Sequence, residues 1–136
     1  MAVIDEIIRV EDDNSLSFGN YSVSEKQKVN EFKALGDVYK VKTHNEITRL
    51  EKNGKLLIET VPGATIHNLT VSEKEVVFWA EGVDDTQITL ELESDAIYKI
   101  VVDDVKLGKM KSNLSGKVSF SAELNSKAKQ ICVEKM

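Results

Sequence analysis

Lys117-Val-Ser-Phe-Ser-Ala-Glu-Leu124 is the stretch of sequence that decides the fold class. Along it, polar residues alternate without exception with the apolar residues Val118, Phe120, Ala122 and Leu124. A β-strand places successive side chains on opposite faces, so a strand here has one dry face and one wet face. A helix would not bury those four residues together. The pattern therefore predicts a half-buried strand whose apolar side chains lie in a core.

The same pattern recurs through the second half of the chain, where turn residues separate short strand-like segments. The predicted strands are Thr65–Val71, Glu75–Glu81, Thr86–Glu93, Ile97–Val102, Val105–Lys111, Lys117–Leu124 and Gln130–Lys135. Seven short strands of this kind predict a sandwich of two antiparallel sheets.

The first half predicts five or six further strands, with few large apolar residues. Glu6–Val10 and Ser15–Tyr21 flank a turn-rich cluster and predict a hairpin. Ser24–Phe32 permits two interpretations. Val29 and Phe32 have the i, i+3 spacing of a short helix, and the same residues fit a strand with a bulge.

Asn53-Gly54 is the clearest turn signal in the chain. It lies between the strand-like segments Ile47–Lys52 and Lys55–Val61. A two-residue type I′ turn needs positive φ at both central positions, and Asn-Gly meets that need. The turn also sets the register of the hairpin. The predicted cross-strand pairs are Leu50 with Leu57, Arg49 with Ile58 and Glu51 with Leu56.

Part of the second half resembles a known group of modules. An aromatic-led strand with an acidic turn, Tyr98-Lys-Ile-Val-Val-Asp-Asp-Val105, is followed by Gly108 and by the turn Asn113-Leu-Ser-Gly116. In this order the segment resembles the small immunoglobulin-like β-sandwiches that end many bacterial carbohydrate-active proteins. The resemblance covers Ile66–Met136 and implies a non-catalytic sandwich module.

The chain also looks like small bacterial proteins that carry an endosialidase label. Sialidases resemble one another in an arginine triad that clamps the substrate carboxylate. This chain contains two arginines, Arg9 and Arg49, so the triad is not present.

Pro62-Gly63 is the best candidate for a boundary within the chain, because proline has no N–H to donate and ends a strand ladder. We expect a β-meander subdomain over residues 1–63 and an immunoglobulin-like β-sandwich subdomain over residues 64–136. The expected fold class is all-β: an antiparallel β-sandwich with an immunoglobulin-like C-terminal half and a small N-terminal β-meander packed against it.

Composition indicates a globular protein that does not bind nucleic acid. Of 136 residues, 41 % are hydrophobic and 30 % are charged, which are globular values. The net charge is −5, whereas phosphate binding needs a concentrated cationic surface. Lys106, Lys109 and Lys111 lie close together on one predicted strand. They fit an anion-binding patch or, as is usual for lysine on a strand, a solvated face that guards a sheet edge.

The N-terminal residues Met1–Glu6 are acidic where a secretory signal would be basic, and no apolar run reaches the length of a membrane span. We therefore expect a cytoplasmic protein that does not associate with membranes. The lone Cys132 allows no intramolecular disulfide, and its alternation with apolar neighbours places it either in the core or on a wet face.

Trp79 is the only tryptophan, and it shares one face of Glu75–Glu81 with Val77. A strand that is apolar on both faces is usually central in its sheet, so the indole fits a packed core. The alternative is a flat platform on which a sugar stacks, with Tyr98 or Tyr39 as a neighbouring aromatic. The burial of the ring distinguishes the two.

No catalytic residue, metal site or cofactor is expected from the sequence. A zinc site at His44 or His67 would need further ligands, such as Glu46 or Glu59, and no spacing on a single element supports one. Phosphate-cradling glycine loops and a serine nucleophile elbow are missing from the sequence.

We therefore expect a non-catalytic assembly or accessory module. Its exposed strand edges or sheet faces would meet another protein or a second copy of the chain. The first alternative is a carbohydrate-binding module that uses Trp79. The second is a small hydrolase or isomerase that uses a histidine and a glutamate.

Overall fold

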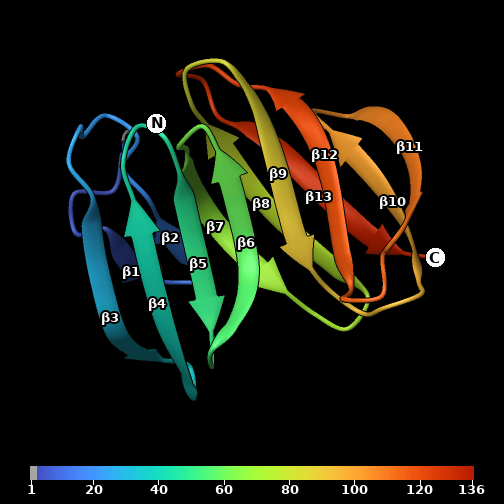
Figure 1. Ribbon diagram of the computed structural model, residues 1–136, viewed down its shortest axis with the longest axis horizontal. Helices are drawn as coiled ribbons and strands as arrows, with labels where there is room; N and C mark the ends of the chain where they lie inside the picture. Colours follow the sequence, from blue (N-terminus) through green and yellow to red (C-terminus); the bar gives the residue numbers. More distant parts are fainter. Residues whose placement is uncertain (1–2) are drawn as a thin grey trace.

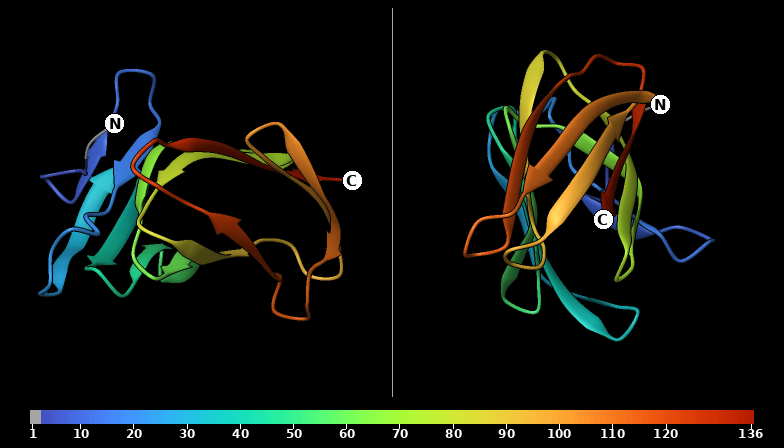
Figure 2. Two further views of the ribbon diagram at one scale, coloured as in Figure 1. Left: turned by 90° about the horizontal axis from the view of Figure 1, so that it is seen from above. Right: turned by 90° about the vertical axis from the view of Figure 1, so that its right-hand side faces the viewer.

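The computed structural model describes residues 3–136 of the protein. The described residues form thirteen β-strands in two antiparallel sheets, one of seven strands and one of six. The sheets lie as two layers, one behind the other (Figure 1, Figure 2). None of the described residues is helical, so the prediction of an all-β fold with two antiparallel sheets is confirmed. Residues 3–136 include no helix of the length and hydropathy that a membrane crossing requires.

The seven-stranded sheet has the order β1-β2-β7-β8-β13-β10-β11. Its strands are β1 (Ile8–Val10), β2 (Leu16–Phe18), β7 (Thr65–Val71), β8 (Glu75–Glu81), β13 (Lys129–Lys135), β10 (Ile97–Val102) and β11 (Val105–Lys111). The six-stranded sheet has the order β12-β9-β6-β5-β4-β3. Its strands are β12 (Lys117–Glu123), β9 (Asp85–Glu91), β6 (Lys55–Val61), β5 (Thr48–Lys52), β4 (Asp37–Thr43) and β3 (Gln27–Ala34).

One hydrophobic core lies between the sheets. The seven-stranded sheet contributes Phe18, Phe78 and Ile131, and the six-stranded sheet contributes Leu50 and Phe120. Each of these side chains is at most 4 % exposed. Burying an apolar side chain of this size contributes about 1.5–3 kcal/mol, so the shared core is the main force that holds the two layers together.

The alternating stretch from Lys117 to Leu124 behaves as predicted. Val118, Phe120 and Ala122 are buried, and the polar residues between them are exposed. The strand with a bulge is confirmed for Ser24–Phe32, because β3 runs from Gln27 to Ala34 and its pairing with β4 shifts between Val29 and Phe32.

The turn at Asn53-Gly54 is also confirmed. Asn53 has φ 51° and Gly54 has φ 83°, as a type I′ turn requires. The pair of Glu51 with Leu56 forms as predicted.

Beyond that pair the predicted register is wrong. Leu50 faces Ile58 instead of Leu57, and Arg49 faces Glu59 instead of Ile58, because the register shifts between Leu50 and Glu51. Such a bulge opposes two residues to one and bends the strand. As a result Leu57 and Ile58 are both buried, at 7 % and 0 % exposed, although they are consecutive.

Strands from the two halves of the chain meet in both sheets. In the seven-stranded sheet β2 pairs with β7, and in the six-stranded sheet β6 pairs with β9. The strand β6 ends at Val61, directly before Pro62-Gly63, as predicted. A Cβ atom on Gly63 would lie 1.9 Å from the carbonyl oxygen of His44, so only glycine fits there. The division into subdomains at residue 63 stays a prediction.

Candidate functional site

The outer face of the seven-stranded sheet carries Trp79, His67 and Cys132. Trp79 lies on β8, in the middle of this sheet, with His67 on β7 and Gln130 on β13 as its cross-strand partners. Its strand neighbours Phe78 and Ala80 are fully buried in the core, so Trp79 points outward, where it is half-buried. Among the described residues there is no helix to cover this face.

A buried acid–histidine pair lies beside Trp79. His67 Nε2 is 2.7 Å from Glu81 Oε1, and the two side chains are only 6 % and 1 % exposed. The hydroxyl of Tyr21 donates to the other carboxylate oxygen of Glu81 at 3.2 Å. Burial first, and then the nearby carboxylate, raise the pKa of Tyr21 above its usual value. Both oxygens of Glu81 therefore have partners, as a buried carboxyl requires.

A carboxyl bonded to one imidazole nitrogen fixes the tautomer and the orientation of the ring, which is how a general base is positioned. Here the pair is enclosed, so neither side chain meets a substrate in this conformation. The contact instead joins β7, β8 and the segment after β2. Tyr21, His67 and Glu81 thus act as a structural cluster that anchors the N-terminal hairpin to the sheet.

A second polar network lies on the β1–β2 hairpin. The Ser17 hydroxyl donates to Glu11, and Arg9 Nε lies 3.2 Å from the same carboxylate. The Ser17 hydrogen bond, against the opposing effect of burial and with help from Arg9, lowers the pKa of Glu11. Ser17 also accepts from the backbone N–H of Asn68 on β7 at 3.0 Å. This network therefore fastens the short β1–β2 hairpin to its neighbour.

A half-buried apolar row crosses the same face next to Trp79. Val77 on β8 faces Cys132 on β13, which faces Val101 on β10. Cys132 is therefore on the outer face, and of the two predicted placements the core is the wrong one. Burial raises the pKa of its thiol, and the carboxylates of Glu75 and Glu134 raise it further. At neutral pH the group is a protonated thiol, which is a weak nucleophile.

Within residues 3–136 the strand β11 pairs only with β10, so it is a free edge of this sheet. All of its residues except Met110 are exposed, including Val105 at 62 % and Leu107 at 48 %. The three lysines of the predicted cluster lie on it, and Lys111 forms an ion pair with Asp95 at 2.9 Å. A long exposed edge presents unpaired N–H and C=O groups to solvent.

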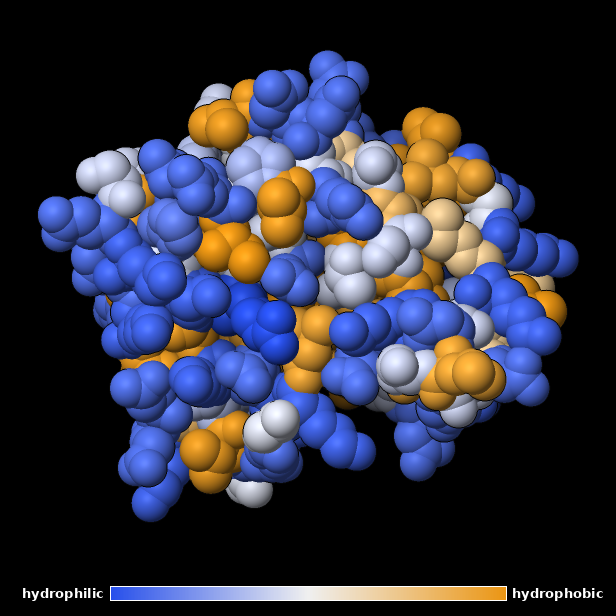
Figure 3. Space-filling view, in the orientation of Figure 1, coloured by the Kyte–Doolittle hydropathy of each residue, from blue (hydrophilic) through white to orange (hydrophobic). Residues whose placement is uncertain are grey.

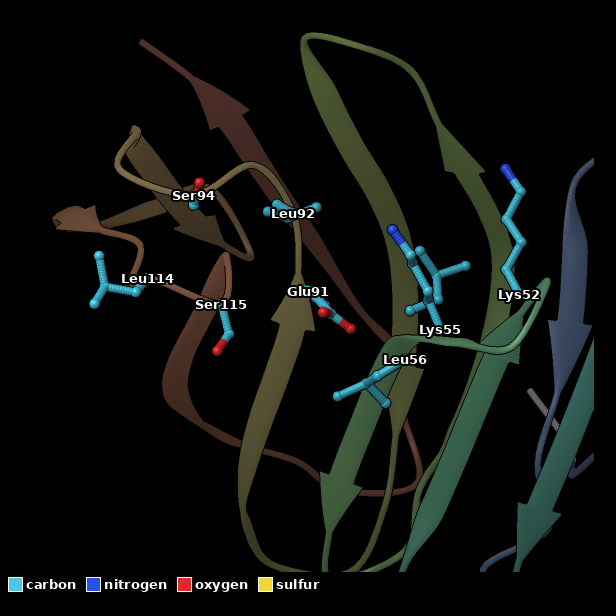
Figure 4. Close-up of a pocket in the computed structure, with 9 residues that line it drawn as sticks. Lys52, Lys55, Leu56, Glu91, Leu92, Ser94, Leu114 and Ser115 are labelled. Atoms are coloured by element: carbon cyan, nitrogen blue, oxygen red, sulfur yellow. The ribbon is translucent and has the colours of Figure 1, made fainter.

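The outer face of the six-stranded sheet is different in character. It is mostly hydrophilic, with scattered apolar side chains (Figure 3). A hollow of about 330 Å³ opens on it where β6 and β9 separate below the bulge (Figure 4). Leu56, Leu57 and Leu92 supply its apolar walls, and Lys55 and Glu91 line it from opposite strands. The β6–β9 ladder ends at Ile58, one residue from Leu57 in the wall of the hollow.

The three residues predicted to bind a ligand do not come together. Trp79 is on the outer face, whereas Tyr98 and Tyr39 are 4 % and 5 % exposed and belong to the core. The Tyr98 hydroxyl accepts from the backbone N–H of Glu93 at 3.1 Å, so its polar end is used within the fold. Trp79 has His67 and Gln130 as neighbours instead.

The carboxylate beside His67 is Glu81 rather than Glu59. Glu59 lies on the other sheet and pairs with Arg49 at 3.7 Å. Sequence reasoning missed Glu81 because its nearness to His67 depends on the β7–β8 register. The sequence did contain one indication: Glu81 is two residues after Trp79 on the same predicted strand, so the two side chains lie on the same face. Within residues 3–136, His, Cys, Asp and Glu side chains form no group of three or more that is able to hold a metal ion.

Comparison of the chain with protein-family models, with curated proteins and with solved structures gave no match.

Proposed function

We propose that this protein is a non-catalytic assembly module that binds another polypeptide chain, with the β11 edge as a docking strand. The observation that carries the proposal is the exposure of β11 along almost its whole length. A partner segment in extended conformation can add to such an edge, where main-chain hydrogen bonds supply affinity and side chains supply selectivity.

The side chains of β11 favour one kind of partner. Val105 and Leu107 are exposed apolar groups that an incoming strand can cover. Lys106 and Lys109 lie on the same strand, and Lys109 faces Lys99 on β10. Lysines on an edge repel other basic strands, and they attract carboxylates by the same charge. The partner is thus an extended segment in which acidic and apolar residues alternate.

Selection from a library of displayed linear peptides tests this proposal. We expect enriched peptides that are rich in Asp, Glu and apolar residues. A synthetic copy of one such peptide is expected to slow hydrogen exchange in Val105–Lys111, because the free edge amides gain partners. Leu107→Glu is expected to abolish binding. Val83→Glu, at a turn residue that is 66 % exposed, is the matched control and leaves binding intact.

Slower exchange in another segment, or binding that survives Leu107→Glu, would contradict the assignment of the β11 edge. Failure to enrich any peptide would count against the function itself.

We infer a β-sandwich in which β7–β13 form the immunoglobulin-like part and the N-terminal half forms a meander. Two observations support it: β3, β4, β5 and β6 are neighbours in chain order, and the seven strands from β7 to β13 are divided between the two sheets. Calorimetry tests the subdomain division, since two folding units give two thermal transitions.

Carbohydrate binding is the second candidate, and the half-buried indole of Trp79 on the outer face of the seven-stranded sheet favours it. A sugar ring stacks on an indole when one face of the ring is free. Titration of the fluorescence of Trp79 with oligosaccharides tests this function. A saturable shift in emission, together with loss of the binding heat when Trp79→Ala is titrated in a calorimeter, would support it. Efficient shielding of Trp79 from acrylamide would argue against a free ring face.

A further inference from the structure

A row of charged side chains crosses the outer face of the seven-stranded sheet. Glu75 on β8 faces Glu134 on β13, which faces Lys99 on β10, which faces Lys109 on β11. Read across the sheet, the charges run negative, negative, positive, positive. Glu75 with Glu134, and Lys99 with Lys109, are like charges directly opposite one another, which destabilise a sheet. The isolated chain therefore contains two unfavourable pairs and one favourable pair.

The structure places these side chains around one residue. The sulfur of Cys132 lies 3.8 Å from Glu75 Oε2. The carboxylates of Glu75 and Glu134 raise the pKa of this thiol, and the ammonium group of Lys99 opposes them. All three charged groups thus surround Cys132 on the outer face.

The neighbouring row on this face is apolar. Val77, Cys132 and Val101 are half-buried on three adjacent strands, and the described residues supply no element that covers them. An apolar centre with a charged margin is the usual anatomy of a protein interface.

We propose that a second copy of this chain docks on this face, related by a two-fold axis that runs parallel to the strands between β13 and β10. Such an axis reverses the order of the charged row in the second copy relative to the first. Glu75 of one copy then meets Lys109 of the other, and Glu134 meets Lys99. The same operation sets Cys132 of each copy against Val101 of the other, so the apolar rows cover one another.

The pattern is self-complementary, as a two-fold interface requires. Each like-charged pair of the isolated chain comes to face a pair of the opposite charge, so the dimer relieves the repulsion that the single chain contains. The docking face is separate from the main-chain edge of β11, and the proposal goes beyond the strand-docking function. Facing sheets pack about 10 Å apart, so the two Cys132 residues are too distant for a disulfide.

Sedimentation velocity of charge-reversed variants at low ionic strength tests the dimer directly. One variant carries Glu75→Lys with Glu134→Lys, and the other carries Lys99→Glu with Lys109→Glu. Each variant alone places four like charges on the face and is expected to be monomeric. An equimolar mixture is expected to form a heterodimer, because the two rows then have opposite charges.

The matched control is Lys40→Glu with Lys117→Glu, which makes the same change of charge at exposed lysines of the other sheet. This control is expected to dimerise like the wild type. A second readout is alkylation of Cys132, which is expected to slow as the protein concentration rises. Wild-type protein that stays monomeric at all concentrations, or a mixture of the two reversed variants that does not associate, would overturn the proposal. Either result leaves the peptide-binding test of the β11 edge unaffected.

Discussion

Replacement of His67 by alanine is the sharpest test of the polar cluster under the N-terminal hairpin. His67 and Glu81 are 6 % and 1 % exposed and lie 2.7 Å apart. Without the imidazole, Glu81 keeps only the Tyr21 hydroxyl as a side-chain partner. Removing one partner of a buried hydrogen bond costs about 1–3 kcal/mol, and more where the group left behind is charged. We expect a loss of that size for His67→Ala.

Chemical denaturation followed by circular dichroism measures this loss, with Arg49→Ala as the matched control. Arg49 pairs with Glu59 at 3.7 Å, and their side chains are 36 % and 25 % exposed. A pair this exposed contributes at most about 1 kcal/mol. The double variant His67→Leu with Glu81→Leu is expected to recover most of the stability, because apolar side chains replace the whole pair. Equal losses for His67→Ala and Arg49→Ala would refute the reasoning.

Four further predictions concern packing, the turn and two titrating groups. Phe120→Ala is expected to reduce the free energy of unfolding by about 3–5 kcal/mol, since Phe120 is 4 % exposed. A loss near zero in denaturant titration would mean that Phe120 lies on the exposed face of its strand. Gly54→Ala is expected to reduce the free energy of unfolding by about 1–2 kcal/mol, because the residue has φ 83° while the space around it is open. An unchanged denaturation midpoint would argue against the type I′ turn. The Ser17 hydrogen bond holds the pKa of Glu11 below the usual glutamate value of 4.5. Its stabilisation is therefore present above that pH and disappears as the pH falls through the lowered folded pKa, and Glu11→Gln should flatten this part of the stability–pH curve. Alkylation of Cys132 at neutral pH is expected to be slower in dilute native protein than in denaturant, because the raised pKa disfavours the thiolate; equal rates would contradict the half-buried placement.

Local patterning was enough to predict most of the strands. Thr65–Val71 and Glu75–Glu81 have the predicted bounds, because alternation and turn residues are properties of neighbouring positions. The bulge beside Leu57 was not predictable in the same way. The extra residue is favoured by the core that Leu57 and Ile58 enter together, and a two-residue turn carries no information about that core.

The arrangement of the outer face was beyond the reach of local patterns. The strand β13 pairs with β8 on one side and with β10 on the other, and both are distant in sequence. Only that order brings Glu134 between Glu75 and Lys99. Parity along each strand predicts which face a side chain takes, but the neighbours across the sheet follow from the topology. Trp79 could thus be assigned a face, whereas His67, Glu81 and the charged row could not be assembled.

The proposed docking of two copies through the charged outer face is tested most directly by the mass of the wild-type protein in light scattering as its concentration rises. At low ionic strength, the account predicts that the mass increases from 15.2 kDa for the single chain toward twice that value, and that added salt reverses the increase. A mass that stays at that of the single chain at every concentration and ionic strength would contradict it.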